Sequence, residues 1–321
     1  MKIGYFLSCE EYSPAELVEQ AVLAERAGFT GLSISDHFHP WNDEQGQSPF
    51  VWSVVGAVSQ ATDLPVTTMV TCPTVRIHPA VVAQAAATSA VLLGGRFRLG
   101  GGSGEALNEH ILGDVWPHAQ VRLEMLEEAV DVMRQLWSGD VVSHRGRHYT
   151  VDTARIYTVP EQPPQLLVSA FGPKAMETAT RIGDGFVTTT PDADGVAAFR
   201  KALGEDVPTV AGLKVAYAGS REEGVEHAHR LWSNAGVPGE LSQVLPSPQH
   251  FEQASSLVTK EATAKSVCAG NDLEEHVSAF QPYADAGFGE VFVANMGPSY
   301  REMIEFYGRE VLPALDARSA G

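Results

Sequence analysis

Short apolar runs alternate with amphipathic segments along most of the chain. Runs typical of buried strands are followed by segments whose apolar residues recur every three to four positions, the spacing of one helix face. The first pair is clear: residues 2–7 predict a strand, and residues 13–28 predict a helix. Ser13 provides an N-cap for this helix, Pro14 fits its first turn, and Gly28 ends it.

The same alternation continues to the end of the chain. The further predicted strands are 31–35, 65–71, 96–102, 165–170, 185–189, 212–219 and 290–295. The further predicted helices are 50–62, 79–93, 122–137, 173–183, 221–236, 274–287 and 300–312. Eight strands alternating with helices, without a linker-like break, favour one α/β domain over residues 1–321. The predicted fold is a single (β/α)8 TIM barrel, in preference to two doubly wound domains.

Two stretches interrupt the repeat and are predicted to be insertions. Alternating residues and a proline-rich end predict an inserted hairpin at about 141–164. A polar stretch at about 237–268 predicts a helical insertion before the last strand.

Composition and charge exclude several classes of protein. The chain is 44% hydrophobic and 19% charged, which is ordinary for a globular domain. Its net charge of −18 comes without a cluster of Lys and Arg, so a nucleic-acid partner is not expected. No apolar run approaches the roughly 20 residues of a membrane span, and residues 1–7 do not resemble an export signal. Three widely spaced cysteines predict neither a disulfide framework nor a zinc cluster, which fits a cytoplasmic protein.

A TIM barrel predicts where functional residues lie, because its active site forms at the C-terminal ends of the strands. Polar and unusual residues do gather after the first six predicted strands. In chain order they are Glu10, DHFHPW (36–41), Cys72 with Thr74, GSGE (102–105), FGPK (171–174) and TTTPD (188–192). This distribution indicates an enzyme.

The glycine-rich stretch at 99–109 lacks both the G-x-G-x-x-G spacing of a dinucleotide fold and a Walker-type lysine. Small residues here allow backbone N–H groups to approach a flat or anionic ligand, with Glu105 at the mouth of the barrel. A tight turn without a function is the alternative interpretation.

The stretch DHFHPW has three interpretations on its own. His37 and His39 could bind a metal, but only Asp36 lies near them and no second ligand cluster has suitable spacing, so no metal site is predicted. A polar loop is the second interpretation. Acid-base chemistry is favoured, because histidine titrates near neutral pH and Asp36 could orient it. Trp41 could cap a planar cofactor, donate its indole N–H to an oxyanion, or simply cover the barrel mouth.

Several stretches resemble the luciferase-like superfamily, and most closely its branch of glucose-6-phosphate dehydrogenases that use coenzyme F420. They are SDHFHPW, GSGEALNEH, LEEAVDVMRQLWSGDVVSHRGRHYT, ARIYTVPEQPP and RIGDGFVTT. The likeness covers nearly the whole chain and is weakest between about 190 and 275.

The resemblance implies a TIM barrel that binds F420, a deazaflavin, at its C-terminal mouth and exchanges a hydride at the ring's C5. It also implies a homodimer acting on a small-molecule substrate. By resemblance, His37 is the base that takes the hydroxyl proton, Trp41 steadies the resulting anion, and Glu105 lies near N1 of the ring. Glu10 matches a further acidic pocket residue, while His39 has no implied role.

The resemblance also implies the residues that hold the cofactor. Asp36 lies against it, and Met69–Val70 falls where the family often has a cis peptide bond behind the ring. The remaining implied cofactor-binding residues are Cys72, Ser103, Gly104, Phe171 and Gly172. In the family, backbone and hydroxyl donors at Ser103, Gly104, Phe171 and Gly172 would hold the cofactor's phosphate. This agrees with the anion-binding interpretation of the glycine-rich stretch at 99–109.

One departure from the family pattern concerns the substrate. Where the sugar-phosphate dehydrogenases have a lysine, after Thr189, this chain has Asp192, and Gln253 and Ser266 fall near the positions of other basic partners. A carboxylate in place of a cation repels a phosphate dianion. We therefore expect an uncharged alcohol or ketone as substrate, and glucose 6-phosphate as a poor one.

Two further functions are compatible with these motifs. A neighbouring branch with the same DHFHPW and GSGEALNEH stretches uses FMN, so an FMN-dependent luciferase-like monooxygenase or reductase is the first alternative. Residues 71–88 and 154–164 resemble the F420 branch more closely, which favours F420. A non-catalytic flavin-binding relative is the second alternative, and the presence of His37, Trp41 and Glu105 argues against it.

Overall fold

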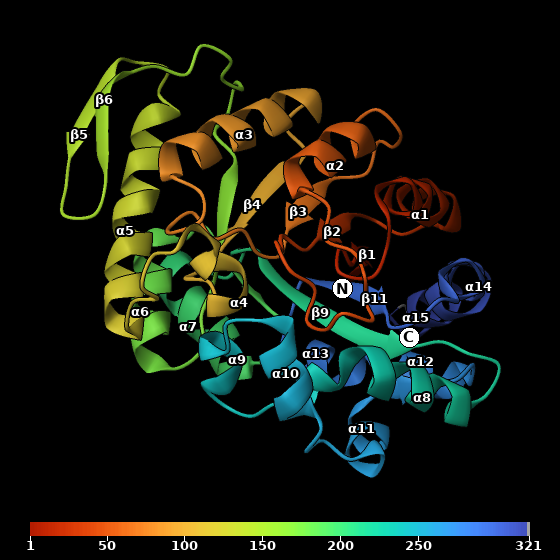
Figure 1. Ribbon diagram of the computed structural model, residues 1–321. Helices are drawn as coiled ribbons and strands as arrows, with labels where there is room; N and C mark the ends of the chain where they lie inside the picture. Colours follow the sequence, from red (N-terminus) through yellow and green to blue (C-terminus); the bar gives the residue numbers. More distant parts are fainter. Residues whose placement is uncertain (320–321) are drawn as a thin grey trace.

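Eight parallel strands close into a barrel in the computed structural model, which describes residues 1–319 (Figure 1). In order around the barrel they are β1 (Lys2–Leu7), β2 (Leu32–Ile34), β3 (Val66–Thr68), β4 (Phe97–Gly101), β7 (Gln165–Ser169), β8 (Gly185–Thr188), β9 (Thr209–Ala216) and β11 (Glu290–Asn295). The ring closes because β9 pairs in parallel with both β8 and β11. The prediction of a TIM barrel is confirmed.

Helices cover the outside of the barrel. They are α1 (Pro14–Ala27), α2 (Val51–Val58), α3 (Pro79–Leu92), α5 (Ala119–Leu136), α6 (Pro173–Ile182), α7 (Ala193–Leu203), α8 (Arg221–Trp232), α12 (Leu273–Ser278), α13 (Gln281–Asp285), α14 (Tyr300–Phe306), the π-helical turn η3 (Tyr307–Val311) and α15 (Leu312–Ser319). Within residues 1–319 no helix is long and apolar enough to cross a membrane.

Local sequence explains where several helices begin and end. Ser13 and Glu16 form a reciprocal capping box at the start of α1, and Gly28 ends the helix in the left-handed conformation, with φ of 95°. The single helix predicted at 274–287 is instead two helices, and Pro282 lies in the first turn of the second. Proline lacks the N–H that an unbroken helix needs at that position.

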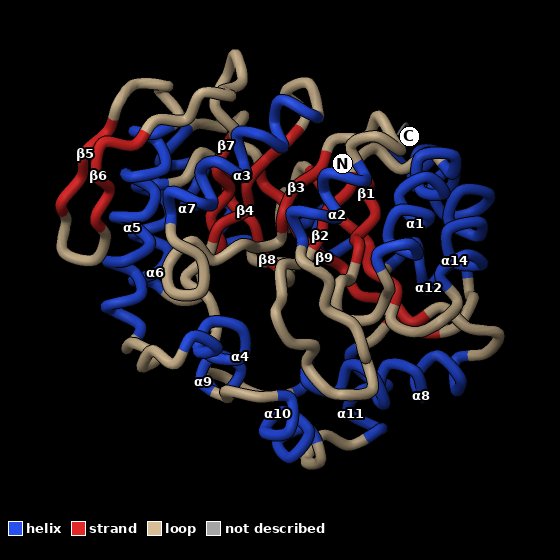
Figure 2. Tube along the Cα trace, turned by 45° about the horizontal axis from the view of Figure 1, so that its top comes forward, coloured by secondary structure: helices blue, strands red, loops and turns tan. Residues whose placement is uncertain are grey.

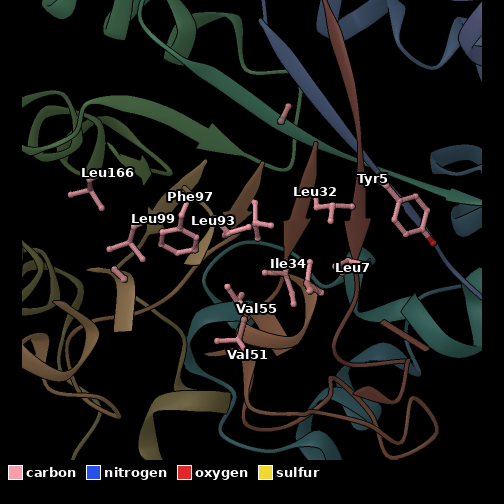
Figure 3. Packing of buried hydrophobic residues seen from close by; sticks show 14 of the residues in the cluster. Tyr5, Leu7, Leu32, Ile34, Val51, Val55, Leu93, Phe97, Leu99 and Leu166 are labelled. Atoms are coloured by element: carbon pink, nitrogen blue, oxygen red, sulfur yellow. The ribbon is translucent and has the colours of Figure 1, made fainter. Parts of the chain in front are cut away.

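Strand residues alternate between two apolar regions. One set packs outward against the helices, and Figure 3 shows Ile34 of β2 beside Val51 and Val55 of α2. The other set fills the barrel interior and consists of Met69, Leu167, Val187, Val210 and Phe292, with Phe6 and Val70 packed against them. The interior is thus closed by apolar side chains below the polar C-terminal mouth.

Three excursions leave the strand-helix order. After β4 come the short helices α4 (Ala106–Glu109) and η1 (His110–Leu112), and after α5 comes the antiparallel hairpin of β5 (Val142–Arg145) and β6 (Thr150–Ala154). After α8 come η2 (Ser233–Gly236), α9 (Leu241–Val244), α10 (Pro248–Ser255), α11 (Lys260–Ser266) and β10 (Cys268–Ala269). The hairpin lies against α5, whereas α9 lies beside α4 (Figures 1 and 2). The assignment of the hairpin and the distal helices as insertions into one domain stays a prediction.

Candidate active site

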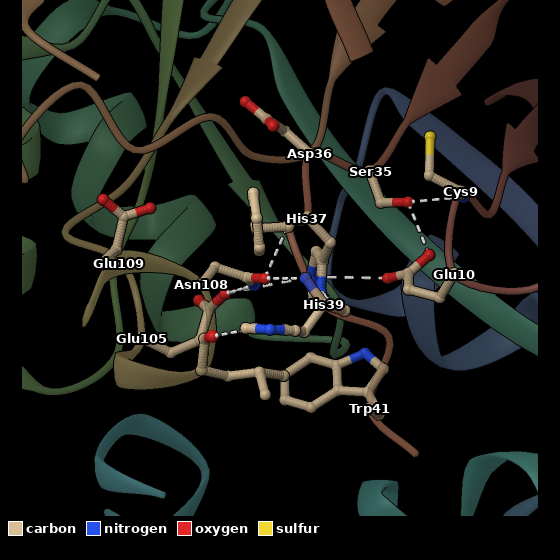
Figure 4. A network of polar contacts seen from close by, with 12 residues as sticks. Cys9, Glu10, Ser35, Asp36, His37, His39, Trp41, Glu105, Asn108 and Glu109 are labelled. Atoms are coloured by element: carbon tan, nitrogen blue, oxygen red, sulfur yellow. Dashed lines mark hydrogen bonds and ion pairs between the residues drawn. The ribbon is translucent and has the colours of Figure 1, made fainter. Parts of the chain in front are cut away.

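The segments after β1 and β2 are fixed together by a buried hydroxyl. The Ser35 hydroxyl donates to Oε2 of Glu10 at 2.7 Å, and the backbone N–H of Cys9 donates to Ser35 Oγ at 2.9 Å (Figure 4). Glu10 and Ser35 are both buried. The Glu10 carboxylate therefore has a defined position at the barrel mouth, as its predicted place after the first strand requires.

His37 lies between two carboxylates. Its Nδ1 is 3.2 Å from the carbonyl oxygen of His39, and because a carbonyl only accepts, Nδ1 carries the proton. In the neutral imidazole Nε2 then carries the lone pair, and it lies 3.5 Å from Glu10 Oε1 and 3.9 Å from Glu105 Oε1. An oriented imidazole with a free nitrogen and acidic neighbours is the arrangement that acid-base chemistry requires.

Asn108 connects the loop after β2 to Glu105. Its Oδ1 accepts from the backbone N–H of Phe38 at 2.7 Å and of His39 at 3.0 Å. Its Nδ2 donates to Oε1 of Glu105, the residue that precedes α4. Because Asn108 is fully buried, both loops are held in a fixed relation. The motif GSGEALNEH contains Asn108, but the sequence assigned it no role.

His39 has a structural partner. Its Nδ1 donates to the carbonyl of Leu107 at 2.9 Å, which anchors the loop after β2 on α4 (Figure 4). Within residues 1–319 no three His, Cys, Asp or Glu side chains are grouped so that they could hold a metal ion.

Trp41 covers one side of the His37 imidazole. The two rings meet edge to face with centroids 5.0 Å apart, and on its other side Trp41 meets Phe251 of α10 in the same way at 4.9 Å. Helix α10, about 200 residues further along the chain, therefore forms part of the wall of the mouth.

Asp36 belongs to a second, buried group of charges. Its Oδ1 lies 2.8 Å from Nη2 of Arg76, and its Oδ2 accepts from the Thr71 hydroxyl at 2.8 Å. Arg76 also pairs with Glu109, through its side chain at 3.4 Å and its backbone N–H at 2.7 Å. Burial raises the pKa of Glu109 to about 7, although Arg76 opposes this shift. Figure 4 shows the Asp36 carboxylate turned away from the His37 imidazole.

Close backbone packing shapes the base of the mouth. The Met69–Val70 peptide bond is cis, as the resemblance predicted. A Cβ on Gly102 would lie 2.8 Å from Val70 Cγ2, and one on Gly104, whose φ is +77°, would lie 2.6 Å from Cys72 Sγ. Only glycine fits these two positions, so the turn that follows β4 packs its backbone directly against Val70 and Cys72.

The loop before α6 suits a phosphate. Gly172 precedes the helix with φ of 86°. It has no side chain that could cap the helix, and the first turn of the helix carries no acidic residue. Pro173, the first residue of α6, has no N–H, so the N–H groups of Lys174 and Ala175 are the donors that an anion would meet at the positive end of the helix. Phe171 beside it is exposed, and Ser103, from the neighbouring turn, is half-buried.

The predicted substrate residues are less closely gathered. Asp192 is the N-cap of α7, where its Oδ1 accepts from Gly195 N–H at 2.9 Å, and it lines a groove of about 790 Å³ with Gly172, Asp194 and Lys201. Thr189 and Gln253 are exposed. Among residues 1–319 none of the three forms a hydrogen bond or ion pair with His37.

Comparisons with known proteins agree with this geometry. The family model described as luciferase-like monooxygenase matches residues 1–290. F420-dependent glucose-6-phosphate dehydrogenases of Microbacterium testaceum and Kribbella flavida are 33% and 36% identical to the chain. The first alignment covers 100% of this chain and 99% of that protein, and the second covers 98% of each.

Solved structures extend the comparison. An F420-dependent secondary alcohol dehydrogenase, in complex with an F420-acetone adduct, is 32% identical, has a TM-score of 0.90 and covers 98% of each chain. A coenzyme F420 dependent tetrahydromethanopterin reductase from Methanopyrus kandleri is 19% identical with a TM-score of 0.77, covers 98% of this chain and 100% of that one, and shares the fold. This chain therefore belongs to the luciferase-like monooxygenase family, as its motifs predicted.

Proposed function

We propose that the protein is a coenzyme F420-dependent oxidoreductase that acts on a small, uncharged secondary alcohol or the corresponding ketone. The observation that carries this proposal is the His37 imidazole, whose Nε2 faces Glu10 and Glu105 beside Trp41 at the barrel mouth. Relatives of nearly equal length are named for F420-dependent alcohol or sugar-phosphate oxidation.

The side chains have distinct roles in this proposal. When bound, F420 supplies a hydride acceptor at C5 of its deazaflavin ring. His37 Nε2 takes the hydroxyl proton of the alcohol, and the Glu10 carboxylate 3.5 Å away stabilises the imidazolium that results. Trp41 donates its indole N–H to the substrate oxygen as negative charge develops there. Glu105, held by Asn108, provides a carboxyl group on the cofactor side.

The backbone around the mouth fits a deazaflavin with a phosphate tail. The glycine turn at 102–104 packs tightly on Val70 and Cys72, and a compact floor of this kind suits a flat ring. The uncapped start of α6, with Phe171, Gly172 and nearby Ser103 and Gly104, provides donors for the phosphate. Cys72 packs beneath Gly104, and Asp36 is oriented by Arg76 at the edge of this surface.

Cofactor titration tests the proposal first. F420 is expected to quench the fluorescence of the protein's five tryptophans, since Trp41 lies in the mouth, whereas FMN is expected to bind more weakly. A panel of secondary alcohols should then reduce bound F420. Tight FMN binding without a response to F420 contradicts the cofactor, and oxygen uptake with reduced FMN supports a monooxygenase. F420 binding without turnover of any alcohol or ketone supports a non-catalytic relative.

Glucose 6-phosphate is expected to be a poor substrate, although many relatives are named for it. By the family resemblance, Asp192 stands where these relatives have a lysine, and a carboxylate in place of that cation disfavours a phosphate dianion. Replacing Asp192 by Lys should raise kcat/KM for glucose 6-phosphate by about tenfold. Asp192→Asn is the matched control, because asparagine keeps the helix cap while removing the charge, so it should give a smaller rise. Efficient turnover of glucose 6-phosphate by the unmodified protein contradicts this expectation.

The homodimer and the cytoplasmic location also remain proposals from the family resemblance. Exposed apolar side chains on α3, namely Val81, Val91 and Leu92, are compatible with a subunit contact.

A further inference from the structure

The end of α8 binds the loop that carries Trp41. Leu231 lies in the last turn of α8, where backbone carbonyls no longer have N–H partners within the helix and need other donors. Nδ2 of Asn42 donates to the Leu231 carbonyl at 2.8 Å, and Nε2 of Gln45 donates to the same oxygen at 2.9 Å. Two side-chain amides from the loop after β2 therefore bind one backbone oxygen that lies 189 and 186 residues further along the chain.

The Gln45 amide connects this contact to Trp41. Because the Leu231 carbonyl only accepts, the amide must turn its Nε2 toward that oxygen, and its Oε1 then faces the loop. This Oε1 accepts from the backbone N–H of Trp41 at 2.8 Å. The backbone N–H of Gln45 donates in turn to Oδ1 of Asn42 at 3.1 Å. Gln45 is 4% exposed and Asn42 is 8% exposed, so little water can replace these hydrogen bonds.

Two exposed contacts join the same two parts of the chain. The backbone N–H of Asp43 donates to Oε1 of Glu252 on α10 at 3.0 Å, and Glu44 pairs with Arg230 of α8 at 3.1 Å. Exposed ion pairs contribute little to holding a loop, because water and salt screen them. The buried amide of Gln45 is therefore the contact that holds the loop on α8.

The position of the Trp41 indole depends on this attachment. The Trp41 side chain is half-buried, and within residues 1–319 its indole N–H forms no hydrogen bond. The ring is therefore directed by its own backbone and by the groups it touches, which are His37, Phe251 and the apolar cluster that includes Trp232 at the end of α8. Gln45 holds that backbone on the same helix end.

We propose that Gln45 is a positioning residue of the active site, which fixes the Trp41 indole beside His37 by holding the Trp41 backbone on the end of α8. The inference rests on the proposed function for its catalytic meaning, whereas the attachment of Trp41 to Leu231 through Gln45 is a property of the protein alone. Methionine at position 45 has a similar size but neither donates nor accepts in this way, so Gln45→Met releases the loop from the helix.

The positioning of Trp41 can be measured without cofactor. The chain has five tryptophans, so incorporation of fluorotryptophan gives few fluorine NMR signals, and Trp41→Phe identifies the signal of Trp41. In Gln45→Met this signal should move or broaden by more than its line width. The signal of Trp137, whose indole N–H donates to Ala83 of α3, should not change. Gln60→Met, at an exposed glutamine, is the matched control and should leave all signals in place. An unmoved Trp41 signal in Gln45→Met overturns the proposal.

A second variant decides the question if Gln45→Met does not fold. In Gln45→Glu the side chain can still accept from the Trp41 N–H, but it has no N–H to donate to the Leu231 carbonyl. The Trp41 signal should then move by less than in Gln45→Met. An unmoved signal in Gln45→Glu shows that the contact with Leu231 does not position Trp41, and this also overturns the proposal.

Catalysis provides the second readout. Gln45→Met should lower kcat for alcohol oxidation by about tenfold, the scale of a misplaced transition-state contact, while the dissociation constant for F420 stays unchanged. Because Gln45 acts through Trp41, adding Gln45→Met to Trp41→Phe should cause no further loss. Losses that multiply in the double variant indicate a role apart from Trp41 and overturn the proposal. If the unmodified protein shows no F420-linked turnover, the proposed function fails while the fluorine signals still decide this inference.

Discussion

Replacing His37 by Gln lowers kcat for F420-linked alcohol oxidation by a factor of about 10²–10⁴, the usual contribution of a positioned general base. Glutamine can still donate to the His39 carbonyl, but it offers no basic nitrogen where Nε2 lies between Glu10 and Glu105. The loss should therefore appear in the proton-transfer step. The dissociation constant for F420 should stay close to that of the unmodified protein, because the proposed phosphate contacts lie on other loops.

Single-turnover reduction of bound F420 by a secondary alcohol measures this effect, with the fluorescence titration as the binding readout. His110→Gln is a suitable control, since His110, the first residue of η1, donates to the Ala106 carbonyl and forms no hydrogen bond or ion pair with Glu10 or Glu105 among the described residues. A His37→Gln variant that retains the full rate contradicts the role given to His37.

Replacing Arg76 by Met is expected to lower the free energy of unfolding by about 3–5 kcal/mol, because removal of one partner leaves buried charge without compensation. The Arg76 side chain is 6% exposed, and its partners Asp36 and Glu109 are 0% and 1% exposed. Urea unfolding followed by circular dichroism measures the change. Arg96→Met is the matched control: its partner Asp63 is 98% exposed, so a loss below about 1 kcal/mol is expected there.

The loss in Arg76→Met should depend on pH with a definite sign. Burial raises the pKa of Glu109 to about 7 in the folded protein, above its ordinary value of 4.5. Ionising Glu109 therefore costs folding free energy as the pH rises from about 4.5 to 7, and this cost is absent below that window. Without Arg76 the cost grows, so the variant should lose more stability at pH 8 than at pH 5. Equal losses at both pH values contradict this account of the buried group.

The barrel could be predicted because each strand has its own local signal. Each of the eight barrel strands overlaps a predicted one, since fully buried parallel strands are short apolar runs that turns separate clearly. The strand β9 begins three residues before the predicted range of 212–219. Helix α7 was not predicted, because its polar residues around 192–194 resemble a continued loop after β8. The break before Pro282 shows the opposite error: the apolar spacing predicted one continuous helix, although a proline in its interior disfavours an unbroken helix.

The meeting of Glu10, His37 and Glu105 could be predicted because barrel topology brings strand ends together. Glu10, His37 and Glu105 follow three different strands, and the structure places one carboxylate oxygen of Glu10 and one of Glu105 each within 4 Å of His37 Nε2. Their assigned roles, like those of the cofactor and substrate residues, remain proposals.

Other partners depend on loop conformation, which periodicity does not encode. An extended loop would point His37 and His39 the same way, but the chain bends between them and His39 binds Leu107 instead. The sequence around Arg76 and Asn108 gives no sign of their partners. Arg76 pairs with a buried carboxylate and Asn108 accepts from backbone N–H groups, and both contacts depend on the three-dimensional fold.

The contact between Trp41 and Phe251 joins two distant parts of the chain to which different tasks are assigned. The side chains proposed for proton transfer lie in the first 110 residues, where the strand ends are constrained by the barrel itself, whereas one wall of the mouth belongs to the segment around α10. Sequence drift in residues 241–266 can therefore reshape what the mouth admits without disturbing the hydrogen bonds around His37. A lineage can in this way acquire new substrates by changing a segment that carries none of the side chains proposed for proton transfer.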